Sequence, residues 1–362
     1  MSNDPDVAPR RRIRSKLTSL EAGRGVAALL VVLYHTWIHC REAYGDFTLG
    51  HIFAFGHAGV DFFFVLSGFI IFEAHRDDIG NPKRLSHYIE RRVTRIYPLY
   101  WAILAFTLLA ASLSPRAFPT AYHIVTSLFL VPTRGDPVMV DAWTLQHEML
   151  FYTLFGLIIL NRRLGLAVFA LWLAAIVAAR FVPVQTDSGL VLKLSAAFNF
   201  EFFLGMGAAY LGHGWKVPAP RLFVLTGVIA FLATGAAEDA RWVTNASVFA
   251  HLGYGIAATM VVIGLVAGER QAVLRAPAAL IRLGGASYSL YLVHVLAIGA
   301  IWQIMLRLKL DSMLPVWAAY SVLIAGAVVS GLLCNTLVEK PAIAFARQLI
   351  VRPKPPTPSI AG

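Results

Sequence analysis

The sequence predicts an all-α polytopic membrane protein with about ten transmembrane helices and both termini in the cytoplasm. Three observations predict this class. Of the 362 residues, 58% are hydrophobic and 14% are charged, whereas soluble domains carry about 25% charged residues. The mean hydropathy is +0.66. Apolar runs of about twenty residues, the length that crosses a bilayer, recur along nearly the whole chain.

The chain divides into three segments by composition. Residues 1–16 form a basic N-terminal segment, 17–340 a transmembrane domain, and 341–362 a short proline-rich tail. The first apolar run is longer than the core of a signal peptide, so we expect it to be retained as a helix. The two cysteines, Cys40 and Cys334, fall on opposite sides of the predicted topology, which argues against a structural disulfide.

The ten predicted spans are separated mostly by short connections. In order they are Leu17–Ile38, Ile52–Phe72, Ile96–Leu113, Trp143–Leu160, Leu164–Phe181, Leu190–Leu211, Leu222–Ala236, Val248–Ala267, Ala286–Leu306 and Leu314–Val338. A shorter apolar piece, His123–Val131, is below spanning length. We expect this piece to lie at the surface or to re-enter the membrane.

The positive charges set the predicted orientation. Most of the 31 lysines and arginines fall in segments that are cytoplasmic if the N-terminus is inside, as the positive-inside rule requires. An even number of spans then returns the C-terminus to the same side. The net charge of +11 is therefore a topology signal, and we expect no nucleic-acid partner.

Two ionisable residues interrupt the first span. Arg24 and His35 are eleven residues apart, which is three helical turns plus about 20°, so their side chains share one face and lie about 16 Å apart along the axis. Ionisable residues at membrane depth usually face the protein interior and mark functional sites. The alternative for His35 is a hydrogen-bonded structural role near a helix end.

The predicted topology gathers polar residues near the outer face. His35 lies near the outer end of the first span, and Asp61 and Glu148 fall at similar depth in the second and fourth spans. We therefore predict a site in which Asp61 or Glu148 orients His35 as a general base, because a neighbouring carboxylate fixes the tautomer and stabilises the protonated ring. Asp61 has the alternative role of a helix cap. For the adjacent His147, a structural role is favoured.

A cluster of arginines lies on the predicted cytoplasmic side. Arg92 and Arg95 are three residues apart and share a helix face, with Arg91 adjacent. The planar guanidinium fork suits phosphate groups, so we predict that Arg91, Arg92 and Arg95 hold a phosphorylated donor. The alternative is contact with anionic lipid head groups. Arg24, deeper in the first span, would line a passage from this donor to His35, about the length of a pantetheine arm.

One further histidine, His294, lies within the ninth span. It could line the donor passage or bond a neighbouring helix, and we favour the structural role. The sequence has no spacing typical of zinc, haem or flavin sites and no phosphate-binding loop. We therefore expect no metal site.

Several strings along the chain resemble the membrane acyltransferase family 3, which modifies bacterial surface and secreted polysaccharides. The matching strings are, in order, Leu20–His35 with its R-x10-H spacing, Gly59–Ile70, Arg91–Trp101 with its R-x-x-R pair, Trp143–Tyr152, and Ser287–His294. Each string alone is weak, but five in order are specific. Gly23 and Thr144 depart from residues common in the family, and neither touches the predicted chemistry.

The resemblance implies transfer of an acyl group, usually acetyl, from cytoplasmic acyl-CoA to a sugar hydroxyl presented at the other side of the bacterial inner membrane. By position, His35 would be the catalytic histidine, Arg24 its partner, Arg92 and Arg95 the pair associated with acyl-CoA, and Glu148 the acidic residue of the fourth span. The chain looks like the stand-alone type that acetylates exopolysaccharides such as succinoglycan. The acceptor would be such a glycan or its lipid-linked oligosaccharide precursor.

Two other function classes fit the same residues. A transporter could use His35, Asp61 and Glu148 as a proton relay, and it would not need the Arg92 and Arg95 pair. A non-catalytic partner in polysaccharide assembly or export would tolerate replacement of His35. Each of the three readings is compatible with a homo-oligomer surrounded by membrane lipids.

Overall fold

The computed structural model describes residues 17–45, 47–113, 117–182, 184–212, 216–245 and 247–350. Within these ranges the chain is helical and contains no β-strand. The predicted all-α class is therefore confirmed. The predicted N-terminal segment 1–16, and residues 351–362 of the predicted tail, lie outside the described residues.

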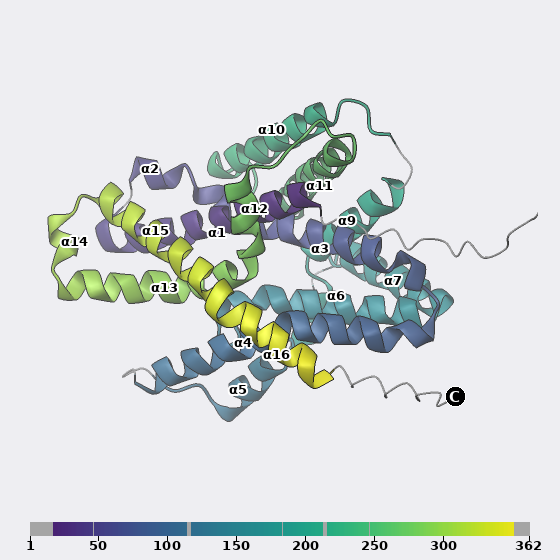
Figure 1. Cartoon of the computed structure of the whole chain (residues 1–362), viewed down its shortest axis with the longest axis horizontal. Coiled ribbons are helices and arrows are strands. Elements are labelled where there is room, and N and C mark those ends of the chain that lie inside the picture. The colour runs from purple at the N-terminus through teal and green to yellow at the C-terminus, as the bar shows by residue number, and fades with distance from the viewer. Residues whose placement is uncertain are drawn as a thin grey trace, which may run out of the picture.

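Among the described residues, ten longer and six shorter α-helices build the fold (Figure 1). The longer helices are α1 (Thr18–Tyr44), α3 (Gly59–His75), α4 (Leu85–Ser112), α6 (Trp143–Leu160), α7 (Arg162–Ala178), α9 (Asn199–Leu211), α10 (Pro220–Asp239), α11 (Val248–Arg270), α13 (Ser287–Arg307) and α15 (Val316–Cys334). The shorter helices are α2 (Thr48–His51), α5 (Ala121–Leu128), α8 (Gly189–Leu194), α12 (Ala278–Gly285), α14 (Leu310–Met313) and α16 (Lys340–Ile350).

Six continuous helical segments among the described residues are long and apolar enough to cross a membrane. They are Ala54–Asp78, Pro82–Ser112, Pro220–Asp239, Val248–Arg270, Ser287–Arg307 and Val316–Leu349, and each overlaps one predicted span. The other four predicted spans also coincide with helices, but α7 has only 17 residues and α1 carries charged residues such as Glu21, Arg24 and Arg41. Ten spans and the cytoplasmic termini thus stay predictions.

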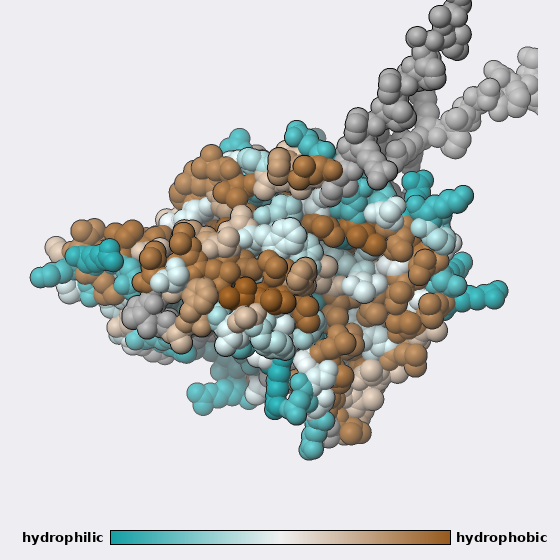
Figure 2. All heavy atoms as spheres, turned by 90° about the horizontal axis from the view of Figure 1, so that it is seen from below, coloured by the Kyte–Doolittle hydropathy of each residue, from teal (hydrophilic) through white to brown (hydrophobic). Residues whose placement is uncertain are grey.

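The surface of the helical bundle supports a multi-pass membrane protein. Figure 2 shows broad hydrophobic areas on the face in view. Large apolar side chains such as Leu171 (70% exposed) and Phe249 (73% exposed) face outward from their helices. A soluble surface rarely exposes such large apolar areas, whereas a lipid-facing surface requires them. The chain is therefore a multi-pass membrane protein.

One predicted span is broken. The sequence predicts a continuous helix over Leu190–Leu211, whereas the chain forms α8, a short non-helical link and α9. The side chain of Asn199 explains the break, because its amide nitrogen donates to the carbonyls of Lys193 (2.7 Å) and Leu194 (3.0 Å) at the end of α8. A side chain that satisfies the last carbonyls of a helix ends that helix.

Two other segments refine the prediction. The short apolar piece His123–Val131 overlaps α5, which packs beside α4 through a hydrogen bond from the Tyr100 hydroxyl to the Ser127 carbonyl (2.7 Å). The tail predicted from residue 341 begins as the amphipathic helix α16, joined to α15 by a π-helical turn, η5 (Asn335–Glu339). In Figure 1, α16 lies alongside α4.

Helix α1 lies at the centre and packs against α3, α11, α12, α13 and α15. Its contact with α12 depends on two glycines. A Cβ atom on Gly284 would lie 1.6 Å from the Glu21 carbonyl oxygen, and one on Gly25 would lie 2.7 Å from the Leu280 carbonyl oxygen. The backbones approach this closely only because both positions lack a side chain. This crossing fixes Arg24, which lies between the two α1 contacts.

The N-terminus of α1 is capped by a side chain from α11. Glu269 accepts hydrogen bonds from the backbone nitrogens of Thr18 (2.9 Å) and Ser19 (2.7 Å), and from both hydroxyls. The first amides of a helix have no partner within the helix, and a carboxylate there also interacts favourably with the helix dipole.

Replacing Glu269 with alanine should therefore destabilise the protein by about 2 kcal/mol, the scale of a lost cap with charged hydrogen bonds. The thermal unfolding midpoint of detergent-solubilised protein measures the effect. Glu42, exposed near the end of α1, offers the control variant Glu42→Ala, which should leave the midpoint unchanged. Equal midpoints for both variants would contradict the capping role.

Candidate functional site

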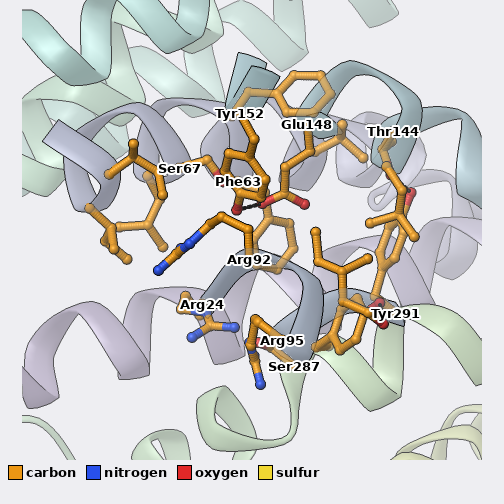
Figure 3. Close-up of a pocket in the computed structure, with 18 residues that line it drawn as sticks. Arg24, Phe63, Ser67, Arg92, Arg95, Thr144, Glu148, Tyr152, Ser287 and Tyr291 are labelled. Atoms are coloured by element: carbon orange, nitrogen blue, oxygen red, sulfur yellow. Dashed lines mark hydrogen bonds between the residues drawn. The ribbon is translucent and has the colours of Figure 1, made fainter. Parts of the chain in front are cut away.

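The predicted arginine site exists as a cavity of about 160 Å³ inside the bundle. Arg24 comes to it from α1, Arg92 and Arg95 from α4, and Glu148 from α6. Figure 3 shows the three arginines on one side of the cavity and Glu148 on the other. The structure thus brings together four of the predicted site residues from three helices.

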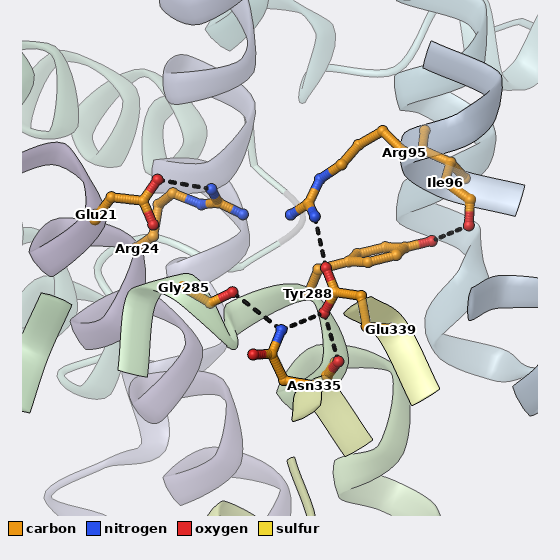
Figure 4. Close-up of polar contacts among 9 residues, drawn as sticks. Glu21, Arg24, Arg95, Ile96, Gly285, Tyr288, Asn335 and Glu339 are labelled. Atoms are coloured by element: carbon orange, nitrogen blue, oxygen red, sulfur yellow. Dashed lines mark hydrogen bonds and ion pairs between the residues drawn. The ribbon is translucent and has the colours of Figure 1, made fainter. Parts of the chain in front are cut away.

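Arg92 leaves its charge available to the cavity, whereas Arg24 also pairs with an acid of its own helix. The guanidinium of Arg92 lies 5.5 Å from the ring centre of Tyr152, and its Nε atom is buried without a hydrogen-bond partner among the described residues. The Nη1 atom of Arg24 lies 3.5 Å from Oε1 of Glu21 on the same helix. In Figure 4 the guanidinium groups of Arg24 and Arg95 point toward one another. Like charges directed at one space favour an anion between them.

Arg95 also has a structural partner. Its Nη1 atom lies 2.5 Å from Oε1 of Glu339, which is 1% exposed (Figure 4). The other oxygen of Glu339 accepts hydrogen bonds from Ser289 (2.5 Å) and Asn335 (2.8 Å). The π-helical turn η5 holds both Asn335 and Glu339 and so aims them at α4. Such turns recur at functional sites.

Arg91 does not join this cavity. Its side chain is exposed, and it is absent from the cavity wall that Arg92 and Arg95 line. One residue along an α-helix rotates the side chain by about 100°, which carries Arg91 to another face of α4. Arg91 thus lies apart from the cavity that Arg92 and Arg95 line, and its predicted part in holding the donor stays a prediction.

Glu148 faces the arginine cavity rather than His35. Its Oε1 atom accepts hydrogen bonds from the Tyr152 hydroxyl and from Ser67 Oγ (3.1 Å). Asp61 is also occupied elsewhere, because its Oδ1 atom lies 2.8 Å from Nδ1 of His251. The predicted pairing of His35 with Asp61 or Glu148 is therefore wrong. Equal depth in the membrane does not fix the direction of a side chain around its helix axis.

His35 instead contacts His294. Nδ1 of His35 lies 3.0 Å from the Val31 carbonyl oxygen and 3.2 Å from Nε2 of His294. Nδ1 of His294 lies 2.7 Å from the Tyr291 carbonyl oxygen. A carbonyl oxygen only accepts, so the neutral rings both carry their proton on Nδ1. Nε2 of His35 is then left with a free lone pair, as a general base requires.

A carboxylate from outside the predicted spans completes this group. Asp141 lies in the 3₁₀ turn η4 (Val140–Ala142), directly before α6. One side-chain oxygen of Asp141 and one ring nitrogen each of His35 and His294 lie within 4.8 Å of one another. Burial raises the pKa of Asp141 to about 6, and the nearby His35 opposes the rise.

Sequence reasoning missed Asp141 and undervalued His294. Asp141 lies in the long connection before Trp143 and so outside every predicted span. Its position just before the Trp143–Tyr152 string was the available signal. His294 was expected in the inner half of its helix with a structural role, whereas it lies against the His35 ring, with ring centres 4.9 Å apart. His147, for which a structural role was favoured, is buried and bonds Asn199 (3.0 Å).

A second cavity of about 470 Å³, the histidine cavity, is lined by His35, His57 and His251. Its wall includes aromatic side chains and several polar groups. These are Tyr34, His35, His57, Asp141, Trp143, Arg180, Phe198, Asn245, His251 and Tyr291. Val60 and Tyr291 line both this cavity and the arginine cavity. The two cavities therefore adjoin inside the bundle.

Tyr291 is held in place at this boundary. Its hydroxyl accepts a hydrogen bond from Thr144 Oγ1 (2.9 Å) and donates one to the carbonyl of Asp141 (3.1 Å). Thr144 faces the arginine cavity, whereas Asp141 faces the histidine cavity. The position of Tyr291 is therefore tied to both sites.

Comparisons with known proteins agree with this arrangement. The chain is 32% identical over 315 residues to the exopolysaccharide production protein ExoZ of Rhizobium meliloti (strain 1021), covering 82% of this chain and 93% of that protein. It is 28% identical over 387 residues to the acyltransferase MdmB of Streptomyces mycarofaciens, covering 94% of this chain and 96% of MdmB. No solved structure matches it significantly. The acyltransferase domain profile matches residues 17–335. Because this match covers nearly the whole described chain, the protein belongs to membrane acyltransferase family 3.

Proposed function

We propose that the protein transfers an acyl group, most simply acetyl, from cytoplasmic acyl-CoA to a sugar hydroxyl of an exopolysaccharide or its lipid-linked precursor. One observation carries this proposal: a cavity lined by three arginines adjoins a cavity lined by a histidine with a free ring nitrogen. Similarity to a protein named for exopolysaccharide production supports the choice of acceptor. The proposed location is the bacterial inner membrane.

The donor would enter the arginine cavity. Arg24, Arg92 and Arg95 offer charge-assisted hydrogen bonds to the phosphate groups of CoA, and guanidinium suits them better than ammonium because its fork binds two oxygens at once. Arg24 and His35 lie on one face of α1 about 16 Å apart along the axis, from the helical rise. A pantetheine arm of similar length would bring the thioester to the boundary at Val60 and Tyr291.

In the proposed reaction His35 acts as the general base. Its Nε2 atom accepts the proton of the sugar hydroxyl while the hydroxyl oxygen attacks the thioester carbonyl. The carbon–sulfur bond breaks, and the protonated ring returns the proton to the CoA thiolate, so that no net proton is consumed. Asp141 stabilises the protonated ring by its negative charge. His294 accepts the Nδ1 hydrogen bond and keeps the reactive nitrogen directed away from Val31.

The direct test is an assay of the purified protein in detergent with acetyl-CoA and an oligosaccharide fragment of the host exopolysaccharide. We expect acceptor-dependent release of free CoA thiol and a mass gain of one acetyl group on the oligosaccharide. Acetyl-CoA binding is measured separately by calorimetry. Absence of both binding and turnover would contradict the proposal and favour the transporter reading.

The carboxylate of Asp141 predicts a pH dependence. Because its pKa is raised to about 6 by burial, the group is charged above this pH and loses its charge as the pH falls through it. Transfer by the wild-type protein should therefore decrease as the pH falls through 6. Asp141→Asn cannot ionise, so this variant should be about tenfold slower at pH 7.5 and should lack the fall near pH 6. An unchanged pH profile in Asp141→Asn would contradict the role of this carboxylate.

A further inference from the structure

A second imidazole lines the cavity that His35 lines, and the chemistry above does not use it. His251 lies in the first turn of α11, and its Nδ1 atom lies 2.8 Å from Oδ1 of Asp61 on α3. His251 is 5% exposed and Asp61 is 1% exposed. Burying a histidine and a carboxylate together is costly unless their geometry is well satisfied. The place of His251 in the cavity wall, with Asp61 behind it, therefore indicates a use beyond packing.

The surroundings fix the His251 ring in one orientation. Asp61 accepts the hydrogen on Nδ1, and the fully buried Glu201 places Oε1 3.6 Å from the same nitrogen. The Phe198 ring centre lies 4.0 Å from the centre of the imidazole. Both acids thus lie on the Nδ1 side, and the polar contacts that His251 makes among the described residues use Nδ1 and not Nε2. With its proton on Nδ1, the neutral ring offers the Nε2 lone pair to the cavity.

The remaining cavity wall suits a carbohydrate. The rings of Tyr34, Trp143 and Tyr291 offer apolar surfaces with polar edges, and Asn245 adds a further hydrogen-bonding group. Sugar rings present apolar C–H faces and many hydroxyl groups, so they need both aromatic surfaces and directed hydrogen-bond partners. His251 supplies a directed acceptor at a fixed position.

We propose that His251, fixed by Asp61, binds the acceptor sugar by accepting a hydrogen bond from a hydroxyl other than the one that is acylated. This inference rests on the proposed function. It gives Asp61 a positioning role through His251 instead of through His35. A site built around such a bond should discriminate against sugars that lack this hydroxyl, because their binding leaves a buried polar atom unpaired.

Two substitutions of His251 separate this role from a purely structural one. In His251→Asn the side-chain amide replaces Nδ1 and keeps the bond to Asp61, but no atom replaces Nε2. In His251→Gln the longer side chain places its terminal amide near the position of Nε2. The experiment measures kcat, the KM for acetyl-CoA and the KM for the oligosaccharide in the full-length protein. Thermal unfolding of each variant is measured beside them.

Acceptor binding predicts that His251→Asn unfolds like the wild type but has a KM for the oligosaccharide raised about tenfold. Its KM for acetyl-CoA should be unchanged, and His251→Gln should recover part of the loss. Asp61→Ala combined with His251→Asn should raise this KM no further than His251→Asn alone. A structural role predicts the opposite order, with a normal His251→Asn and an impaired His251→Gln, and this order would overturn the inference.

The two proposals fail in different ways. Turnover by the wild type with normal acceptor KM values in every His251 variant would overturn only the role of His251. Lack of turnover and of acetyl-CoA binding in the wild type itself would overturn the acyltransferase mechanism and, with it, this inference.

Discussion

Replacing His35 with alanine should lower the rate of acyl transfer by a factor of 10² to 10⁴, the usual loss when a general base is removed. The structure gives the reason, because His35 lines the second cavity and its Nδ1 atom is bonded to Val31 and His294, which leaves Nε2 as the nitrogen with the lone pair. Release of CoA in the presence of the oligosaccharide measures the loss. Acetyl-CoA binding should persist, since the arginine cavity is intact.

The control is His123→Ala, which removes an exposed histidine on α5 and should have full activity. The rate of acyl transfer by His294→Ala should lie between the rates of His35→Ala and His123→Ala. In this variant Nδ1 of His35 keeps its bond to the Val31 carbonyl but loses the second acceptor. Normal acyl transfer in His35→Ala would refute the assignment of the base. Size-exclusion chromatography shows whether His35→Ala still folds. If it does not, His35→Gln, whose side chain has a similar volume, serves as the test and should be equally inactive.

The second large effect concerns the arginines, which the structure divides into two kinds. Arg92 has no acidic partner among the described residues, whereas Arg95 neutralises the buried carboxylate of Glu339. Arg92→Ala should therefore raise the Kd for acetyl-CoA by about 10- to 100-fold, the scale of one or two charge-assisted hydrogen bonds. Its unfolding midpoint should stay near that of the wild type. Calorimetric titration and thermal unfolding measure the two quantities.

Arg95→Ala should lose both binding and stability. Removing the guanidinium leaves Glu339 buried and without its cation, which should lower the free energy of unfolding by about 1.5–3 kcal/mol. Adding Glu339→Gln should restore part of the stability, because the uncompensated charge is gone, but should not restore donor binding. Recovery of binding in the double variant would show that Arg95 acts only as a structural partner. Arg91→Ala, on the exposed face of α4, is the matched control.

The sequence predicts the helices and the shared position of Arg92 and Arg95 better than the partners of His35. Each predicted span overlaps a helix because hydrophobic runs report burial along the chain. Arg92 and Arg95 share a cavity because spacing within one helix fixes their common face. The contacts of His35 depend on rotations of separate helices about their axes, which a hydropathy pattern does not encode. Thus Asp61 and Glu148 were expected at His35, where the structure has His294 and Asp141.

The break after α8 illustrates the same limit. The run Leu190–Leu211 is apolar enough to read as one span, yet a single polar residue, Asn199, satisfies the ends of α8 and also bonds His147. The mean hydropathy of a long apolar run is hardly changed by one polar residue such as Asn199. The consequence is local but important, because the link carries Phe198 against the ring of His251.

The boundary formed by Val60 and Tyr291 has an electrical consequence for the proposed mechanism. Water-filled cavities that open to opposite sides of a membrane concentrate the fall of the transmembrane voltage across the boundary between them. A charge crossing there would do work of about 2.3 kcal/mol per 100 mV. In the proposed reaction the acyl group passes this boundary in one direction and the proton of the sugar hydroxyl passes in the other, so no net charge crosses while CoA stays on one side and the glycan on the other. The thioester alone then supplies the driving force, and the cell spends none of its ion gradients on decorating the polysaccharide.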